Sequence, residues 1–241
     1  MIPYWMSRTQ LMLGDAAVEK LMQKTILIIG LGGVGGICAE MIARAGIGKI
    51  TIVDNDTIDA SNINRQIPAL HSTIKKSKAK VLAARLLDIN PNLQLEVQEL
   101  YIKEEITSGL LQSTQWDYVV DCIDTLSSKV FLIKKCVDLQ LPIVSSMGAG
   151  GKIDPSQIKV TDISKTRECN LARYVRKRLH TLGIKNGVKV VFSPEKADQS
   201  RIIETEKAFP KKSIIGTLSY MPAIFGCTVA SVVIRDLMAM D

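Results

Sequence analysis

The sequence lacks several features that would narrow its function at once. Its five cysteines form no CxxC pair, which argues against a structural zinc site, and their irregular spacing is typical of reduced thiols. The N-terminal residues contain no continuous apolar run like that of a signal peptide, so we expect a cytoplasmic protein. Internal repeats and Gly/Ser-rich linkers are also absent, and 241 residues fit a single domain with a substantial core.

Positive charge is concentrated in one segment. The net charge of the chain is +7, and residues 165–189 contain eight Lys or Arg against one acid, Glu168. This segment therefore carries the positive excess of the whole chain. Its cations are Lys165, Arg167, Arg173, Arg176, Lys177, Arg178, Lys185 and Lys189.

Residues 213–234 carry no charge, and 22 such positions are enough in principle to cross a bilayer. Gly216, Pro222 and Gly226 interrupt the run, and polar side chains are scattered through it. We interpret it as a buried loop that leads into a closing helix from about Pro222 to Met238, and we expect no stable membrane insertion. Contact with a membrane is the alternative.

The first half of the chain alternates short apolar runs with helical patterns, which predicts an α/β fold with a doubly wound, mostly parallel, Rossmann-like sheet. The predicted strands are Thr25–Ile29, Lys49–Val53, Leu93–Glu99, Tyr118–Asp121 and Pro142–Ser145. The predicted helices are Val34–Ala45, Lys75–Ile89, Lys103–Gln112 and Leu126–Leu139.

The pattern changes after residue 148. Two antiparallel strands, Gln157–Asp162 and Val188–Phe192, are predicted on either side of a helix at Leu171–Leu182. Residues 195–220 are expected to be irregular, and the closing helix follows them.

A glycine-rich turn follows the first predicted strand. In Gly30-Leu31-Gly32-Gly33-Val34-Gly35, Gly30 permits a tight turn, and Gly32 and Gly33 let backbone N–H groups approach a phosphate. Gly35 allows close packing of the following helix, whose N-terminus attracts an anion. Asp54 ends the next strand, where an acid can bind a ribose hydroxyl. Strand, turn, helix and acid together predict a nucleotide site.

The residues after the turn favour ATP over NAD. Asn62, Asn64 and Arg65 lie in one short run, and Lys78 supplies a second cation, which suits the charge of a triphosphate. Asp124 follows the carboxyl end of a predicted strand, where an acid can hold Mg²⁺ against the phosphates.

Each of these residues also has a simpler interpretation. Lys78 can be a solvated helix charge, Asp124 can cap the next helix, and the two asparagines can be turn residues. An NAD-dependent dehydrogenase is a further alternative, but it needs a hydride-transfer residue, and neither His71 nor His180 has a paired acid. The combination of residues favours ATP.

Several motifs resemble the adenylating domain of the ubiquitin-activating-enzyme-like superfamily, and the resemblance covers nearly the whole chain. The matching residues are GLGGVG at 30–35, Asp54 with Asp56 close behind, NINRQ at 62–66, Lys78, and CID at 122–124. The resemblance implies ATP and Mg²⁺ as cofactors. It assigns ribose binding to Asp54, phosphate binding to Arg65 and Lys78, and magnesium binding to Asp124.

The same resemblance implies a homodimer. In the superfamily an N-terminal arginine reaches into the neighbouring site, and Arg8 matches its position. Residues 1–241 are then expected to form one ThiF-type adenylating domain. It would have a helical arm at 1–24, a nucleotide-binding half at 25–147 and a substrate half at 148–241.

One stretch points to a branch of the superfamily. GAGGKIDPSQIKVTDISKT, residues 148–166, is similar to the tRNA threonylcarbamoyladenosine dehydratases. The resemblance implies that a carboxylate on the tRNA attacks the α-phosphate of ATP and that pyrophosphate leaves. The carbamoyl nitrogen then closes a ring on the acyl-adenylate, so no enzyme nucleophile is needed. A monovalent cation near residues 148–151 and a sulfur-transfer partner protein are left open.

The basic segment supports a tRNA substrate. On the helix at Leu171–Leu182, helical spacing predicts an inward apolar face, formed by Leu171, Val175, Leu179 and Leu182. It projects a basic ridge outward, formed by Arg173, Arg176, Lys177 and His180. Such a ridge suits a phosphate backbone, although a solubilising helix face has the same pattern.

Two other functions stay open. One is an activator that adenylates a small ubiquitin-like sulfur-carrier protein. Cys169 is roughly placed for the cysteine that accepts the carrier or sulfur in such enzymes, but the missing zinc cysteines and the basic helix argue against this function. The other is a non-enzymatic protein that binds ATP without turnover.

Overall fold

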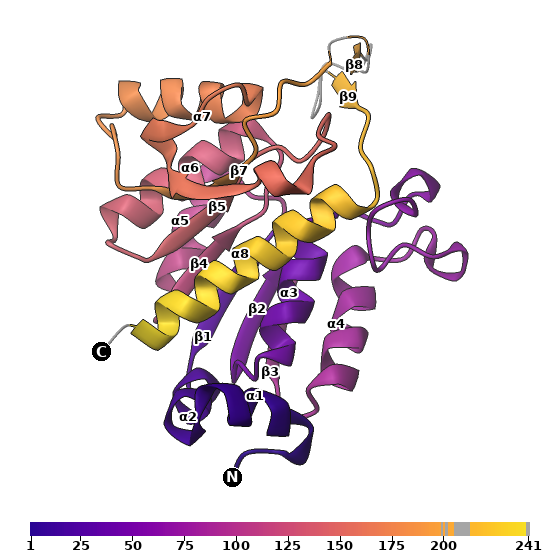
Figure 1. Ribbon diagram of the computed structural model, residues 1–241, viewed down its shortest axis with the longest axis vertical. Helices are drawn as coiled ribbons and strands as arrows, with labels where there is room; N and C mark the ends of the chain where they lie inside the picture. Colours follow the sequence, from indigo (N-terminus) through magenta and orange to yellow (C-terminus); the bar gives the residue numbers. More distant parts are fainter. Residues whose placement is uncertain (199, 201, 205–212, 240–241) are drawn as a thin grey trace.

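The helices and strands alternate along most of the chain (Figure 1), and the computed structural model describes residues 1–198, 200, 202–204 and 213–239. The helices are α1 Ser7–Leu13, α2 Asp15–Met22, α3 Gly35–Arg44, α4 Lys78–Ile89, α5 Glu104–Gln112, α6 Leu126–Asp138, α7 Asn170–Thr181 and α8 Tyr220–Ala239. The strands are β1 Thr25–Ile29, β2 Lys49–Val53, β3 Gln94–Gln98, β4 Tyr118–Asp121, β5 Ile143–Ser146, β6 Lys159–Asp162, β7 Lys189–Phe192, β8 Ile202–Glu204 and β9 Ser213–Ile215.

Seven strands form one sheet in the order β3-β2-β1-β4-β5-β7-β6. Neighbours run parallel except for the edge strand β6, which is antiparallel to β7. The strand order changes direction between β1 and β4, and in such sheets a ligand binds outside the carboxyl ends of the strands at this point. The predicted doubly wound sheet with antiparallel C-terminal strands is therefore confirmed.

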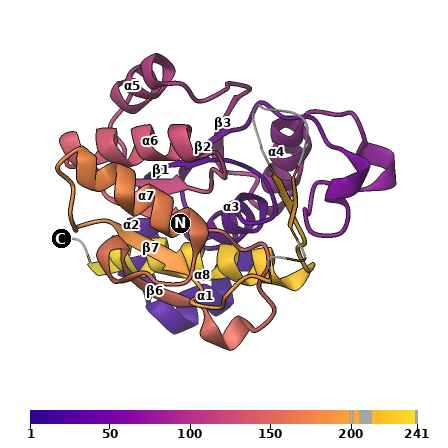
Figure 2. The same ribbon diagram turned by 90° about the horizontal axis from the view of Figure 1, so that it is seen from above.

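Helices cover both faces of the sheet (Figures 1 and 2). In β1, Ile26 and Ile28 join a buried cluster with α3, α4 and α8, whereas Leu27 and Ile29 join a second cluster with α5, α6 and α7. Because successive side chains of a strand point to opposite faces, a strand covered on both faces is apolar throughout. This burial explains the continuous apolar run of β1.

The structure differs most clearly from the expected elements in three places. Helix α4 begins at Lys78 rather than Lys75, because Lys75 has a left-handed φ of 68° and the Ser77 side chain caps the helix. Strand β7 pairs in parallel with β5 as well as antiparallel with β6. The region expected to be irregular contains the hairpin β8–β9, although residues 199, 201 and 205–212 lie outside the described residues.

Helix α8 corresponds to the predicted closing helix and begins at Tyr220. Among the described residues it is the one helix long and apolar enough to cross a membrane by length and composition, and half of its most apolar window is buried within the protein. Gly226 brings it against α3, since a Cβ atom there would lie 2.5 Å from the carbonyl oxygen of Val34. This packing is typical of a core helix.

Candidate nucleotide site

The glycine turn joins β1 to α3 at the switch point of the sheet. Gly30 has a φ of 88°, and a Cβ atom on it would lie 2.7 Å from the carbonyl oxygen of Cys122, which follows β4. A Cβ on Gly35 would lie 1.7 Å from the carbonyl oxygen of Gly30. Larger residues at these two positions would force the turn and α3 apart.

The middle of the turn borders open space. A Cβ on Gly32 would meet only the Gln66 side chain, at 3.8 Å, whereas one on Gly33 would lie 2.9 Å from Pro222 and 3.0 Å from the carbonyl oxygen of Arg65. The turn therefore packs on α8 at Gly33 and leaves room at Gly32. An anion can approach the backbone N–H groups and the N-terminus of α3 on that side.

Asp54 is hydrogen-bonded to the turn. Its carboxylate accepts the backbone N–H of Leu31 at 2.6 Å and that of Asp56 at 2.8 Å. Burial raises the pKa of Asp54 above its ordinary value, and the two N–H donors and the charge of Lys78 act in the opposite direction. The carboxylate is thus fixed beside the turn, where a ribose would lie.

Lys78 is not the solvated helix charge of the simpler interpretation. Its side chain is 7% exposed and forms an ion pair with Asp56 at 2.8 Å, and its backbone N–H donates to the Asp56 carbonyl oxygen at 3.1 Å. The ammonium group therefore lies at the N-terminus of α4, close to Asp54. Asp56, by contrast, is 61% exposed and can exchange this partner for solvent.

Asn62, Asn64 and Arg65 form hydrogen bonds that stabilise the segment after β2. Asn62 completes a capping box with Asp59, as a turn residue would, and the Asn64 side chain donates to the Thr217 carbonyl oxygen at 3.0 Å. Arg65 donates to the Asn64 side chain at 2.7 Å and is partly exposed. Its backbone borders Gly33, but its guanidinium group is held by its own segment.

Gln66, the last residue of the NINRQ motif, is a candidate contact to which the sequence assigned no role. It is 8% exposed, and its Oε1 atom is the buried side-chain oxygen or nitrogen that, among the described residues, has no hydrogen-bond partner. Its Nε2 atom is the nearest group to the open space above Gly32. This amide nitrogen is a donor, so it can contact a phosphate or another acceptor of a ligand in the turn. The position of Gln66 directly after Arg65 is the feature of the sequence that could have indicated this contact.

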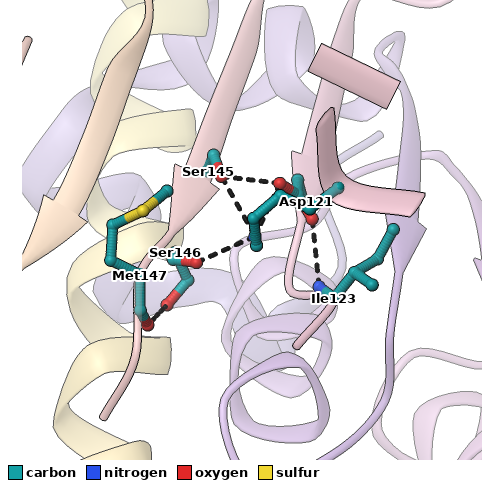
Figure 3. Close-up of polar contacts among 6 residues, drawn as sticks. Asp121, Ile123, Ser145, Ser146 and Met147 are labelled. Atoms are coloured by element: carbon teal, nitrogen blue, oxygen red, sulfur yellow. Dashed lines mark hydrogen bonds and ion pairs between the residues drawn. The ribbon is translucent and has the colours of Figure 1, made fainter. Parts of the chain in front are cut away.

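A buried ion pair shapes the loop that carries Asp124. Lys129 and Asp121 are both fully buried and form an ion pair at 2.7 Å, and Ser145 donates to the same Asp121 oxygen at 2.6 Å (Figure 3). The other Asp121 oxygen accepts the backbone N–H of Ile123 at 3.0 Å. Since a buried charge needs such partners, the network fixes the loop after β4.

Asp124 follows this fixed loop and is exposed at the carboxyl edge of the sheet. The N-cap of α6 is Thr125, so Asp124 does not occupy the capping position. Its neighbour Cys122 contacts Gly30. The structure therefore brings Asp124 and the glycine turn to adjacent strand ends, and a carboxylate at this place suits a magnesium ion that bridges to phosphates.

Arg8 lies apart from these residues within the same chain. It is exposed on α1, and the preceding Met6 packs under Gly46, between α3 and β2. Figure 1 places α1 and α2 at the end of the sheet opposite the carboxyl ends of β1 and β4. Arg8 is thus not brought to the glycine turn of its own chain.

Helix α7 carries the basic ridge only in part. Ala172, Val175 and Leu179 are buried, Leu182 is 42% exposed, and Arg173 and Lys177 face solvent as expected. Arg176 instead is partly buried and donates to the carbonyl oxygen of Thr166 at 2.8 Å. The expected inward orientation of Leu182 is wrong, because α7 ends at Thr181.

The fold and the turn define a nucleotide-binding α/β protein, and comparison with known families agrees. Residues 7–240 match the model of the ThiF family, and the chain belongs to that family. The resemblance inferred from the motifs is thereby confirmed.

Two dehydratases and a carrier adenylyltransferase are among the proteins to which the chain is similar. The chain is 36% identical to a tRNA threonylcarbamoyladenosine dehydratase of Bacillus subtilis, over 96% of this chain and 94% of the relative. It is 34% identical to the E. coli tRNA N6-threonylcarbamoyladenosine dehydratase solved in complex with ATP, with a TM-score of 0.86 over 96% of this chain and 93% of that one. It is 33% identical to the sulfur carrier protein ThiS adenylyltransferase of Escherichia coli, over 60% of this chain and 59% of that protein.

Proposed function

We propose that this protein catalyses the ATP-dependent dehydration of threonylcarbamoyladenosine in tRNA through a carboxyl-adenylate. The observation that carries the proposal is the extent of similarity to dehydratases, which reaches 96% of the chain, whereas the similarity to a carrier adenylyltransferase stops at 60%. The glycine turn, the fixed Asp54 and the Gln66 amide nitrogen beside Gly32 fit ATP. We expect the enzyme to work in the cytoplasm.

In this proposal the residues of the turn orient the α-phosphate for attack by the substrate carboxylate. Asp54 holds the ribose, Lys78 and Arg65 bind phosphate oxygens, and the N–H groups around Gly32 receive negative charge as pyrophosphate leaves. Asp124 would hold Mg²⁺, which neutralises charge on the phosphates when bound. The carbamoyl nitrogen then displaces AMP and closes the ring, so the net change in the nucleoside is the loss of one water.

The test is mass spectrometry of the nucleosides after incubation of the protein with ATP and threonylcarbamoylated tRNA. We expect the modified nucleoside to lose one water in the presence of ATP and to stay unchanged without it. No conversion by a folded, ATP-binding protein would contradict the proposed function.

The second candidate is adenylation of a sulfur-carrier protein, which the likeness to the ThiS adenylyltransferase favours. ATP–pyrophosphate exchange with candidate carriers, set against modified tRNA, separates the two functions. A sulfur-transfer partner protein belongs with this candidate. Whether a monovalent cation binds beside residues 148–151 stays open.

We also propose a homodimer with Arg8 in the neighbour's site. The N-terminal arm exposes apolar side chains that a partner could cover, since Leu11 and Met12 are each 82% exposed and Tyr4 is 93% exposed. Arg8 lies in the same arm, away from its own glycine turn. In the substrate half, residues 148–241, we assign tRNA binding to Arg173, Arg176 and Lys177.

Replacement of Lys78 tests the phosphate assignment. Lys78→Ala is expected to slow turnover by about a hundredfold or more, the usual scale for losing an electrostatic contact to a transition state. The fold should persist, because the Asp56 carboxylate left behind is 61% exposed. The matched control is Lys80→Ala, two residues along α4, whose side chain is 71% exposed and pairs with Glu99. Equal rates for the two variants would remove Lys78 from the site.

Replacement of two cysteines separates ring closure from a thioester or persulfide route. Cys169 is buried at the start of α7 and Cys227 is exposed on α8. Since ring closure supplies its own nucleophile, Cys169→Ser combined with Cys227→Ser is expected to leave the dehydration rate nearly unchanged. A large loss of rate in a protein with parent-like thermal stability would instead favour the carrier-type function.

A further inference from the structure

Two basic hollows share Arg167, one at the N-terminal end of α7 and the other at the edge strand β6. The first has a volume of about 260 Å³, and its cations are Arg167, Arg173, Arg176 and Lys196. The second has a volume of about 280 Å³ and contains Lys159, Lys165 and the same Arg167. We call these six cations the basic tract. Glu168 is the one carboxylate among the residues that line the hollows.

Several cations elsewhere in the fold are paired with carboxylates, whereas the basic tract is a group of neighbouring cations without such pairs. Lys78, Lys129 and Arg85 each form an ion pair with a carboxylate. Within the described part of the chain, no member of the basic tract forms one. Arg176 is partly buried and donates to Thr166 alone, both to its carbonyl and to its hydroxyl oxygen. The other five cations are exposed, and unpaired cations gathered in one place attract an anionic ligand.

The shape of the basic tract favours a chain of phosphates over a single anion. The two hollows share Arg167, so the tract extends from α7 to β6, the edge strand of the sheet. A lone pyrophosphate would need one hollow. Successive phosphates of a nucleic acid backbone would occupy both, with Arg167 between them.

The basic tract is separate from the glycine turn but connected to it. Cys122, Arg65 and Pro222 surround the turn, and none of them lines a hollow. A Cβ on Gly151 would lie 2.8 Å from Ala197 in the wall of the first hollow, and the Gly151 N–H donates to the Gly216 carbonyl oxygen.

The carbonyl oxygen of Thr217, the residue after Gly216, accepts a hydrogen bond from the side-chain amide of Asn64 near the glycine turn. A short series of contacts thus joins the first hollow to the nucleotide site. A backbone held in the hollows can present a nucleoside across the loop at 148–151 to ATP in the turn.

We propose that the basic tract binds the phosphodiester backbone of the RNA substrate, with Arg167 bound between two phosphates. This inference rests on the proposed function and deepens it. The basic tract would direct the RNA backbone from Arg173 and Arg176 toward β6, rather than along the outer face of α7 toward His180. The exposed Tyr174, whose ring lies 5.0 Å from the Arg173 guanidinium carbon, adds a surface on which a base can stack.

Arg167→Ala tests the basic tract, with Lys185→Ala as the matched control. Both side chains are exposed cations of the same basic segment, but Lys185 lines neither hollow. We would measure tRNA affinity at several salt concentrations for parent, variant and control, with ATP affinity measured alongside. Arg167→Ala is expected to bind tRNA about tenfold more weakly and to reduce the salt slope by about one, since at least one phosphate contact is lost. Lys185→Ala should match the parent.

The outcomes separate the two proposals. Parent-like tRNA binding by Arg167→Ala, or an equal loss in Lys185→Ala, would overturn the basic tract while leaving the proposed function standing. A matching loss of ATP affinity would assign the hollows to the nucleotide and would also overturn it. A parent protein that binds no tRNA would overturn the proposed function together with this inference. Arg167→Lys, which keeps the charge, should retain most of the salt slope.

Discussion

Asp124→Ala is expected to abolish adenylate formation while the protein remains folded. Asp124 is exposed, and the loop before it is held by the buried ion pair of Asp121 and Lys129. Removal of the Asp124 carboxylate therefore leaves the buried network intact. Without its carboxylate, magnesium would lose its protein ligand, and the charge that develops on the phosphates would not be neutralised. We expect turnover to fall by more than about a hundredfold, measured as ATP–pyrophosphate exchange in the presence of modified tRNA.

Asp138→Ala is the matched control for this result. Asp138 is also an exposed aspartate, at the end of α6, where it pairs with Lys134 on the surface. Exposed pairs contribute little to stability, so this variant should keep the parent rate. Near-normal turnover of Asp124→Ala would refute the assignment of Asp124. A parallel loss in both variants would point to a general effect of removing surface charge.

Mixed dimers are expected to regain activity from two inactive variants. If Arg8 completes the neighbouring site, Arg8→Ala and Asp124→Ala are each inactive as homodimers. In a mixed dimer one site has Asp124 from its own chain and Arg8 from the other, and activity should return to that site. The measurement is turnover after subunit exchange has been verified by mass spectrometry of the intact dimers.

The control for this experiment mixes Asp124→Ala with Lys78→Ala. Both residues belong to the part of the site that one chain supplies, so every site in this mixed dimer carries a lesion and should stay inactive. If exchange is verified and the Arg8 mixture also stays inactive, Arg8 does not act across the interface.

Strands β1, β2 and β4 could be predicted from sequence because a strand buried on both faces is a continuous apolar run. The bounds of β1, β2 and β4 coincide with the predicted ones. The hairpin β8–β9 gives no such signal, since its strands are three residues long and Ile203 is 66% exposed. The prediction that α4 begins at Lys75 is wrong, because Lys75 has a left-handed φ that the pattern of apolar residues does not reveal.

The candidate site was predictable only where function depends on local sequence. The glycine turn and Asp54 follow from spacing along the chain. Lys129 does not, because its burial against Asp121 and Ser145 requires the ends of two strands to meet. The orphaned oxygen of Gln66 and the two basic hollows are likewise products of packing between distant segments. A role that depends on a partner subunit, such as the one proposed for Arg8, leaves no trace in the contacts of one chain.

The packing of α8 has a consequence for synthesis on the ribosome. Translation proceeds from the N-terminus, and α8 follows the rest of the described sheet and helices. Yet Pro222 forms a wall of the glycine turn at Gly33, and Phe225 and Val229 lie in the core beside α3. When β1 and α3 have emerged from the ribosome and α8 has not, the nascent chain therefore exposes the apolar face of α3 and an open glycine turn. We therefore expect this apolar face to be prone to aggregation until α8 has been synthesised.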